Sequence, residues 1–161
     1  MLFGLGRIRG GVHPDGHKAD SARFEINSHL PLPDTLWLPL CQHSGEDAKP
    51  LVQVGERVLK GQRIAAAAGR FSANIHAPTS GTVTAIDTIT MPHPSGLPAK
   101  AIILQPDGQE EWIALTPPPD PFAMPQEELA TLVEQAGIVG MGGAIFPAAI
   151  KLRQGRRFEI K

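Results

Sequence analysis

Short runs in which apolar and polar residues alternate fill the middle of the chain, and glycine-containing turns separate them. Strands are predicted at residues 51–54, 57–59, 63–68, 74–78 and 82–87, with a further strand at 101–104. Strands of about 4–6 residues joined by such turns are typical of a small, flattened β-barrel or sandwich. The 16 prolines and 17 glycines also disfavour an all-helical chain. A mainly β fold is therefore expected.

The flanking segments follow other patterns. Residues 1–28 are polar and glycine-rich, and they predict an irregular extension. Residues 28–40 contain Leu-Pro-Leu-Pro and Leu-Trp-Leu-Pro-Leu, which favours an extended edge segment because proline is confined to such places in a sheet. After the proline-rich linker at 116–121, residues 125–137 predict an amphipathic helix that begins with acidic residues and ends at Gly137. Its predicted apolar face comprises Leu129, Leu132, Val133 and Ala136.

Charge and composition restrict the possible partners. The formal net charge is −1, so no global field favours nucleic acid or an anionic membrane surface. No apolar run approaches the roughly 20 residues that span a bilayer, and glycine and arginine interrupt the first apolar residues, so no signal peptide is predicted. The single cysteine, Cys41, excludes an internal disulfide framework and an all-cysteine iron–sulfur cluster within these residues, and it is predicted to be a partly buried thiol. We expect a soluble protein of a reducing compartment.

No catalytic or metal-ligating set stands out. The six histidines are scattered without metal-ligand spacing, so no metal site is predicted; they are His13, His17, His29, His43, His76 and His93. Five acidic residues are expected to be solvated in turns or at strand ends, namely Asp34, Glu46, Asp47, Glu110 and Glu111. Trp37 and Trp112 are predicted to be core or domain-contact residues.

The most informative segment is the glycine-rich loop at residues 137–151, which runs straight into a predicted helix. Glycines at 140, 142 and 143 remove Cβ atoms that would keep a ligand from the backbone. Pro147 suits the first turn of a helix, where no intrahelical N–H is lost. This arrangement is typical of a loop whose backbone amides hold a phosphate. The structural alternative is a helix connection that binds nothing.

The middle segment resembles the barrel-sandwich hybrid fold of biotinyl and lipoyl carrier domains. The resemblance rests on Val-Gly-Glu-Arg-Val-Leu-Lys-Gly-Gln at 54–62 and Ala-Pro-Thr-Ser-Gly-Thr-Val-Thr-Ala-Ile at 77–86. In those carriers a lysine at the hairpin tip receives the cofactor. This chain has Arg70 about where that lysine would stand, and a guanidinium stays protonated and forms no such amide. The fold is therefore expected without the carrier chemistry.

A longer ordered set of motifs resembles RnfC, a component of the Rnf (Rsx) electron-transport complex. The set consists of Gly-Gly-Val-His-Pro at 10–14, Lys-Gly-Gln at 60–62, His-Ala-Pro-Thr-Ser-Gly-Thr-Val at 76–83, His-Pro-Ser-Gly-Leu at 93–97, Pro-Asp-Gly at 106–108 and Gly-Met-Gly-Gly-Ala-Ile-Phe-Pro at 140–147. It covers nearly all of the chain. The resemblance implies a hybrid domain at residues 29–116, followed at 117–161 by a proline linker, a helix and the start of a flavin-binding domain.

The resemblance also implies a function and cofactors for the whole family protein. Such complexes couple electron flow between ferredoxin and NAD to ion movement, and RnfC lies peripherally on the cytoplasmic face of the bacterial inner membrane. Its membrane association runs through the other subunits. FMN and two 4Fe-4S clusters are implied for the intact protein, with none held by these residues alone. Gly140, Gly142, Gly143 and Lys151 match the flavin-phosphate loop, whereas Ile145 and Ala148 replace the family's usual glycine and threonine.

We therefore expect a non-catalytic docking and structural domain of an electron-transfer protein. One alternative is the related hybrid domain in the A component of the sodium-translocating NADH:quinone reductase, and another is an unmodified biotinyl/lipoyl-like binding module. The residues after Gly137 are expected to be mobile or to borrow a neighbour's surface, because their helix would have no sheet to cover.

Overall fold

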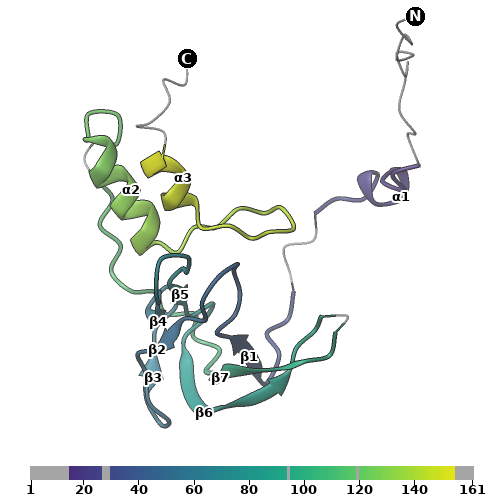
Figure 1. Cartoon of the computed structure of the whole chain (residues 1–161). Coiled ribbons are helices and arrows are strands. Elements are labelled where there is room, and N and C mark those ends of the chain that lie inside the picture. Colours follow the sequence, from purple (N-terminus) through teal and green to yellow (C-terminus); the bar gives the residue numbers. More distant parts are fainter. Residues whose placement is uncertain (1–14, 27–29, 94, 119, 155–161) are drawn as a thin grey trace, which may run out of the picture. The chain divides into compact units, whose positions relative to one another are not determined.

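The fold consists of two compact units, residues 1–31 and 32–161. The computed structural model describes residues 15–26, 30–93, 95–118 and 120–154 (Figure 1). In the first unit the described part contains one helical turn, α1 (Ala19–Ala22). Of the irregular extension predicted at residues 1–28, residues 1–14, which include the motif at 10–14, and residues 27–28 lie outside the described residues. The described residues 15–26 are irregular apart from α1. The predicted boundary at 116–117 stays a prediction.

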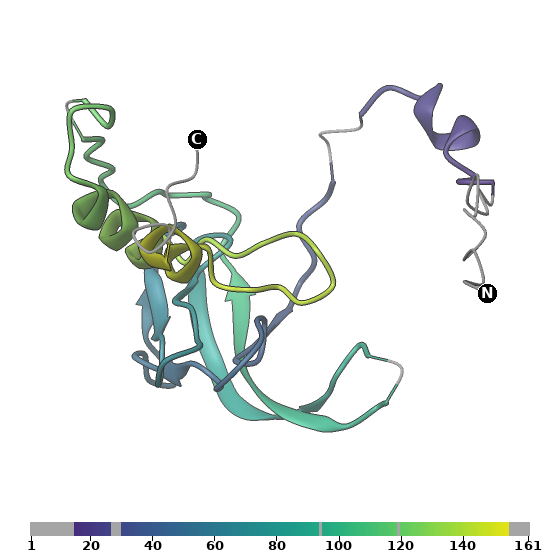
Figure 2. The same cartoon turned by 45° about the horizontal axis from the view of Figure 1, so that its top comes forward.

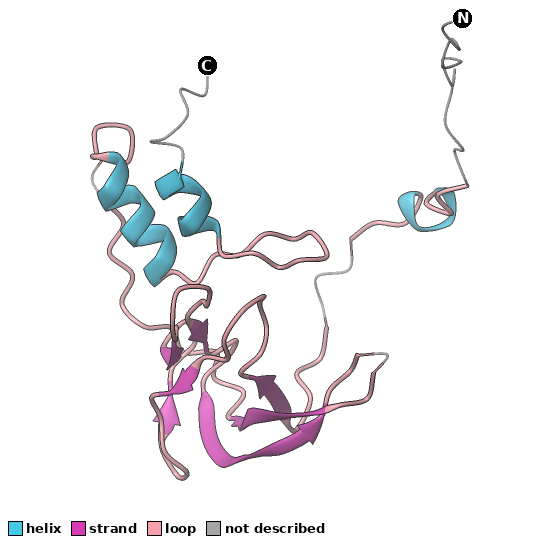
Figure 3. Ribbon diagram, in the orientation of Figure 1, coloured by secondary structure: helices cyan, strands magenta, loops and turns pink. Residues whose placement is uncertain are grey.

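Seven strands of the second unit form two antiparallel sheets (Figure 3). The strands are β1 (Leu36–Pro39), β2 (Lys49–Pro50), β3 (Arg57–Val58), β4 (Arg63–Ala66), β5 (Ile75–His76), β6 (Gly81–Thr90) and β7 (Pro98–Pro106). One sheet has the order β1-β7-β6-β3 and the other β2-β4-β5. The predicted mainly β fold is confirmed, and β1 is an edge strand, as the prolines around it predict.

The hydrophobic core draws on both sheets. Its largest fully buried members are Val58, Ile64, Val83, Ile102 and Leu104. The outward residues between them are polar or partly exposed, since successive side chains of a strand point to opposite faces. The core therefore holds the two small sheets against each other, and this packing defines the barrel-sandwich arrangement.

The β6–β7 pair is the longest ribbon of the fold, and both strands are strongly curved (Figure 2). The register between them shifts between Val83 and Ala85, where Thr84 is the extra residue. Such a bulge bends the strand and increases its twist. Beyond the bulge, Ile86 and Ile102 still pack in or against the core, and β6 leaves it at Asp87, since Asp87, Thr88 and Thr90 are all exposed.

One predicted strand is wrong. Residues 51–54 form no strand, because β2 ends at Pro50 and the chain then leaves the ladder. Leu51 still donates a hydrogen bond to the Ile64 carbonyl at 2.9 Å, yet only Val52 turns inward. The alternating pattern there reflects one buried side chain in an irregular connection. The other strands lie where predicted, with β6 and β7 longer than expected.

The described part of the second unit also contains two helices, α2 (Gln126–Gln135) and α3 (Ala148–Gln154). The predicted end of α2 is confirmed, because Gly137 has φ +67° and its N–H bonds the Glu134 carbonyl while the Ile138 N–H bonds that of Val133. The predicted apolar face is wrong at Ala136, which is exposed. The fully buried residue of α2 is Ala130, which the pattern did not single out.

Candidate functional site

The glycine loop, residues 138–147, is a closed ribbon that leads from α2 to α3 (Figure 1). The Gly140 N–H donates to the Phe146 carbonyl at 2.8 Å, and the Ile145 N–H donates to the Gly142 carbonyl at 2.9 Å. Val139 pairs with Pro147 in an antiparallel bridge, and Ala148 closes the base by bonding the Ile138 carbonyl. The loop has a defined shape before any ligand arrives.

The three predicted glycines fall in different parts of this loop. A Cβ at Gly142 or Gly143 would meet no atom within 4 Å, and both residues are exposed. Their amides donate no hydrogen bond within the described part of the chain. Gly140 differs, because its amide is already bonded to Phe146. Only two of the three predicted amides are therefore available to an external acceptor.

The residues that follow these glycines complete the loop and begin α3. Ile145 has φ +43°, a left-handed conformation that a β-branched residue rarely adopts and that the family's usual glycine adopts freely. Pro147 immediately precedes α3, where its missing N–H is tolerated. Lys151, one turn into α3, places its Nζ 5.6 Å from the centre of the Phe146 ring. The loop and its predicted lysine thus lie on one side of the second unit.

The β4–β5 connection, residues 67–74, forms the hairpin tip at which a carrier domain would hold its lysine. We call this segment the tip hairpin. Arg70 is exposed there, and its guanidinium lies 5.3 Å from the centre of the Phe71 ring. Inside the hairpin, Asn74 Oδ1 accepts a hydrogen bond from the Ala67 N–H at 2.9 Å. The tip is therefore internally braced and presents an arginine where a carrier domain has its lysine.

The tip hairpin and the glycine loop are in contact. The rings of Phe71 and Phe146 lie 5.8 Å apart at 58°, a tilted geometry favourable for aromatic pairs. Residues 44–46 bridge the same two segments. The Ser44 N–H donates to the Ile145 carbonyl at 3.2 Å, and the Glu46 N–H donates to the Phe71 carbonyl at 2.8 Å.

The helices are fixed to the barrel through the same hairpin. Asn74 Nδ2 donates to the Glu134 and Gln135 carbonyls at 3.0 and 3.3 Å, at the end of α2. A Cβ at Gly137 would lie 2.3 Å from the Asn74 carbonyl oxygen, so only glycine fits this approach.

Helix α3 is held on α2. Arg153 bonds Glu127 and Glu134, each at 2.7 Å, and Gln126 Nε2 donates to the Leu152 carbonyl. Ala149 of α3 is buried. We expected the residues after Gly137 to be mobile or to borrow a neighbour's surface, because their helix would have no sheet to cover. For residues 138–154, α2 and the tip hairpin of the same chain provide the packing surface.

A cavity of about 170 Å³ lies between the tip hairpin and the start of the glycine loop. His43 and His76 both line it, together with Val139. His43 is nine-tenths buried, and its Nε2 has no hydrogen-bond partner among the described residues. Burial, reinforced by the charge of Arg63, lowers the pKa of His76. The His76 imidazole is therefore neutral at neutral pH.

An ionic cluster ties the segment after β7 to β3 and to the turn that follows β3. Lys60 and the buried Thr79 both bond Glu110, and Arg57 bonds Asp107 and Glu111 at 2.9 and 2.8 Å. The hydrogen bond from Lys60, followed by that from Thr79, lowers the pKa of Glu110. Glu111 is exposed, as predicted, whereas Glu110 is only partly exposed, and both carboxylates are in addition ion-paired.

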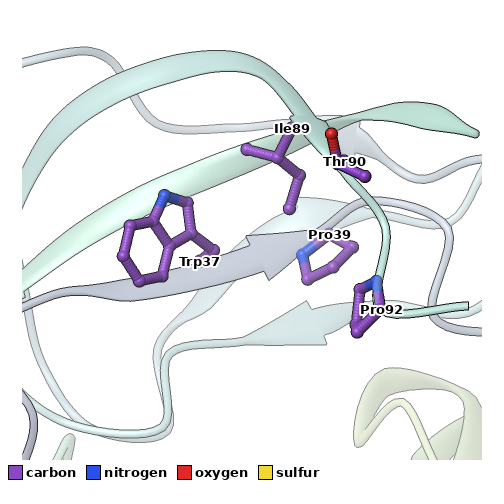
Figure 4. A pocket seen from close by; sticks show the side chains of 5 residues that line it. All are labelled: Trp37, Pro39, Ile89, Thr90 and Pro92. Carbon is purple, nitrogen blue, oxygen red and sulfur yellow. The ribbon is translucent and has the colours of Figure 1, made fainter. Parts of the chain in front are cut away.

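The two tryptophans are not core residues, as Trp37 is 56% and Trp112 54% exposed. Trp112 lies under the Lys60 ammonium, 5.2 Å from the nitrogen. Trp37 forms one wall of an open apolar groove of about 510 Å³ on the outer side of β1 (Figure 4). In that figure its ring and the side chains of Pro39, Ile89 and Pro92 surround the hollow.

The described residues contain no group of three or more histidine, cysteine, aspartate or glutamate side chains placed to hold a metal ion. Within the same ranges, no helix has the length and apolar character needed to cross a bilayer. Cys41 is partly buried, as predicted, with its Sγ 3.8 Å from the Met91 Sδ. Burial, and secondarily the Asp47 charge, raises the pKa of its thiol.

Two antiparallel sheets around one core, with a hairpin tip that lacks a lysine, define the class: a barrel-sandwich hybrid domain without a carrier residue. Residues 6–109 match the family described as the RnfC barrel sandwich hybrid domain. The chain belongs to the RnfC family, whose members are components of an ion-translocating oxidoreductase complex.

Relatives named as the C component of that complex match far beyond the hybrid domain. The chain is 48% identical over 153 residues to the protein of Rhodobacter capsulatus, covering 95% of this chain and 29% of the relative. It is 49% identical over 152 residues to that of Vibrio cholerae, covering 94% and 20%. The Pseudomonas aeruginosa protein is 48% identical over 151 residues, covering 94% and 19%. The chain thus spans less than a third of the length of these relatives.

The structure groups only part of what the sequence singled out. Gly140, Gly142, Gly143 and Lys151 lie on one loop-and-helix unit, as the motif predicts. Phe71 and Asn74, which hold this unit to the barrel, were not predicted. No local signal identifies them, because their partners lie more than 50 residues away in the sequence.

Proposed function

We propose that this chain is the N-terminal hybrid domain and adjoining loop of an RnfC protein that serves a membrane-bound complex. The complex would pass electrons between ferredoxin and NAD and couple this flow to ion movement. The observation that carries the proposal is the identity of 48–49% over 94–95% of the chain to proteins named as that component. The protein would lie peripherally on the cytoplasmic face of the bacterial inner membrane and be held there by its partner subunits.

Within that complex, we propose a docking and structural role rather than a catalytic one. The apolar groove around Trp37 supports this role. Its residues lie outside the core, and large exposed apolar patches on soluble domains commonly mark interaction sites. The ring of Trp37 stays more than half exposed on an edge strand, so a partner's apolar segment can cover it without any change in the barrel.

The glycine loop is proposed to contact FMN in the intact protein. The amides of Gly142 and Gly143 are uncrowded and donate no hydrogen bond within the described residues. The Lys151 ammonium lies near the base of the loop, so this segment fits one wall of a phosphate site. Gly140 would contribute shape rather than a hydrogen bond. FMN supplies redox chemistry when bound, while these residues bind and orient it.

The implied iron–sulfur clusters are proposed to lie elsewhere in the intact protein. A 4Fe-4S cluster needs several cysteine thiolates, and these 161 residues contain one cysteine. Cys41 therefore provides no ligand set, and both clusters belong to other parts of the full-length protein.

Removal of residues 1–115 from full-length RnfC tests the docking role. The expected result is loss of co-purification with the other subunits from detergent-solubilised membranes. Trp37→Ser in the full-length protein is the finer variant, and Leu115→Ser, which also removes an exposed apolar side chain, is its matched control. Normal assembly of both the deletion and the Trp37→Ser proteins would refute the docking role.

The competing assignment, the A component of the sodium-translocating quinone reductase, makes a different binding prediction. Full-length protein should bind FMN and NADH, which quenching of flavin fluorescence and nicotinamide titration measure directly. Binding of a quinone without either nucleotide would favour the competitor.

A further inference from the structure

We propose that Phe71, at the tip of the β4–β5 hairpin, is a positioning residue that sets the glycine loop through Phe146. The hairpin tip that holds a prosthetic group in carrier domains would here act as a brace for a ligand-binding loop. The step from loop position to FMN affinity rests on the function proposed above. The brace itself concerns only residues of this chain.

The tip hairpin and the glycine loop are joined both directly and through residues 44–46. The ring of Phe71 meets that of Phe146 at 5.8 Å, and its carbonyl accepts a hydrogen bond from Glu46. Two residues earlier, the Ser44 amide bonds the Ile145 carbonyl, which directly precedes Phe146. The hairpin tip therefore contacts the loop directly through the aromatic pair, and it is linked to the loop indirectly through the backbone of residues 44–46.

The position of the loop on the barrel depends on this brace, because the loop's own hydrogen bonds close it on itself and on the start of α3. Helix α3, which follows it, has only seven residues, and helices of this length are not stable alone. The space beside Gly142 and Gly143 is open, since a Cβ added at either would meet no atom within 4 Å, and Met141 is fully exposed. Phe146, by contrast, is partly buried and is the aromatic residue of the loop. Its ring is the point at which the barrel can fix the orientation of the loop.

The charges around the two rings fit the same role. Arg70 lies 5.3 Å from the centre of the Phe71 ring, and Lys151 lies 5.6 Å from that of Phe146. Each ring thus holds a cation by its face, an arrangement that is favourable for aromatic rings. The aromatic pair therefore sets the position of Lys151 as well as that of the loop.

Amide hydrogen exchange in the 161-residue chain tests the brace without any ligand. The reporters are the Gly140 and Ile145 amides, whose hydrogen bonds close the loop. Phe71→Ala should accelerate their exchange about tenfold, since an aromatic contact and its buried area are worth roughly 1.4 kcal/mol. Phe71→Tyr should restore wild-type exchange. Phe122→Ala, at a 98% exposed aromatic residue, is the matched control and should change nothing.

Two further measurements separate positioning from general destabilisation. The Val83 and Leu104 amides, within the barrel, should keep their protection in Phe71→Ala. The double variant Phe71→Ala/Phe146→Ala should exchange no faster than Phe146→Ala alone, because one contact is removed in both. Unchanged loop exchange in Phe71→Ala, or additive effects in the double variant, would overturn the proposal.

The link to FMN is measured in full-length RnfC by flavin fluorescence. Phe71→Ala should weaken FMN binding about tenfold by the same contact energy, with Phe71→Tyr close to wild type. Wild-type protein that binds no FMN would refute the proposed flavin role, whereas the exchange experiment would still decide the brace. FMN affinity that is unchanged by Phe71→Ala would show that the brace does not serve the ligand.

Discussion

The Ser80 hydroxyl donates a hydrogen bond to Asp107 Oδ1 at 2.6 Å and joins the turn before β6 to the turn after β7. The Ser80 Oγ in turn accepts a hydrogen bond from the Glu111 N–H at 3.0 Å. Ser80 is fully buried, whereas Asp107 also reaches Arg57 at the surface. Two motifs that are separate in the sequence, Thr-Ser-Gly and Pro-Asp-Gly, are therefore two halves of one interaction.

Replacement of Ser80 by alanine should lower the free energy of unfolding by about 1–3 kcal/mol, because it removes one hydrogen bond and leaves the Glu111 amide without its acceptor. Urea denaturation measures this difference. Thr88→Ala, at an exposed position on β6, serves as the control and should change stability by less than about 0.5 kcal/mol. Equal effects of the two substitutions would mean that the buried hydroxyl has no special role.

Acid should weaken the fold through Asp107 and Glu110. The hydrogen bond from Ser80 lowers the pKa of Asp107, and that from Lys60 lowers the pKa of Glu110, so folding favours both ionised forms. Their contribution is fully present above the ordinary values of 3.8 and 4.5 and is lost as pH falls through the lower folded pKa values. The urea midpoint should therefore fall between about pH 5 and pH 3, and Asp107→Asn/Glu110→Gln should flatten that slope. Asp34→Asn, at an exposed residue, should leave it as steep as in wild type.

Ile145→Gly should stabilise the chain by about 1 kcal/mol, because it removes a β-branched residue from a left-handed conformation that costs roughly 1–2 kcal/mol. The loss of its partly exposed side chain and the greater freedom of unfolded glycine offset part of the gain. Ile145→Val retains the branched Cβ and should give no gain. A loss of stability in the glycine variant, measured by urea denaturation, would show that the conformation at this position is not strained.

Arg153→Met should release α3 from α2 while the barrel stays intact. The substitution keeps an unbranched apolar stem and removes the bonds to Glu127 and Glu134. Amide exchange within α3 should accelerate several-fold, because a helix of seven residues depends on its neighbour. Arg23→Met also breaks a surface ion pair, in the first unit, and should leave α3 unchanged. Slow exchange in α3 of Arg153→Met would assign its stability to the packing of Ala149 instead.

Much of the fold was predictable because its determinants are local. Alternation at 82–87 and 101–104 located β6 and β7, and Gly137 located the end of α2. The prediction failed where one buried residue produced an apparent strand, as Val52 did. The length of β6 was also underestimated. Its outer half is stabilised by backbone pairing with β7 rather than by burial. Backbone pairing alone requires no alternation of apolar and polar side chains, so the sequence carries no signal for it.

The candidate site was predictable only in part, because several of its contacts join residues that are far apart in the sequence. Glycines followed by Phe-Pro mark a loop before a helix, and the loop is there. The pairing of Gly140 with Phe146 and the contact of Phe146 with Phe71 depend on how the chain returns to the hairpin. Neither spacing nor composition contains that information. The ion pair of Glu110 was likewise not predicted, since its partner Lys60 precedes it by 50 residues.

The ribbon of β6 and β7 has two parts with different freedom to change in evolution. Its β6 residues up to Ile86 pack in or against the core, whereas the exposed Thr88 and Thr90 of the outer arm can be substituted at small cost in stability. The groove wall formed by Ile89 and Pro92 belongs to that arm. Under the proposed docking role, the sequence of this surface can therefore change while the barrel that presents it remains the same.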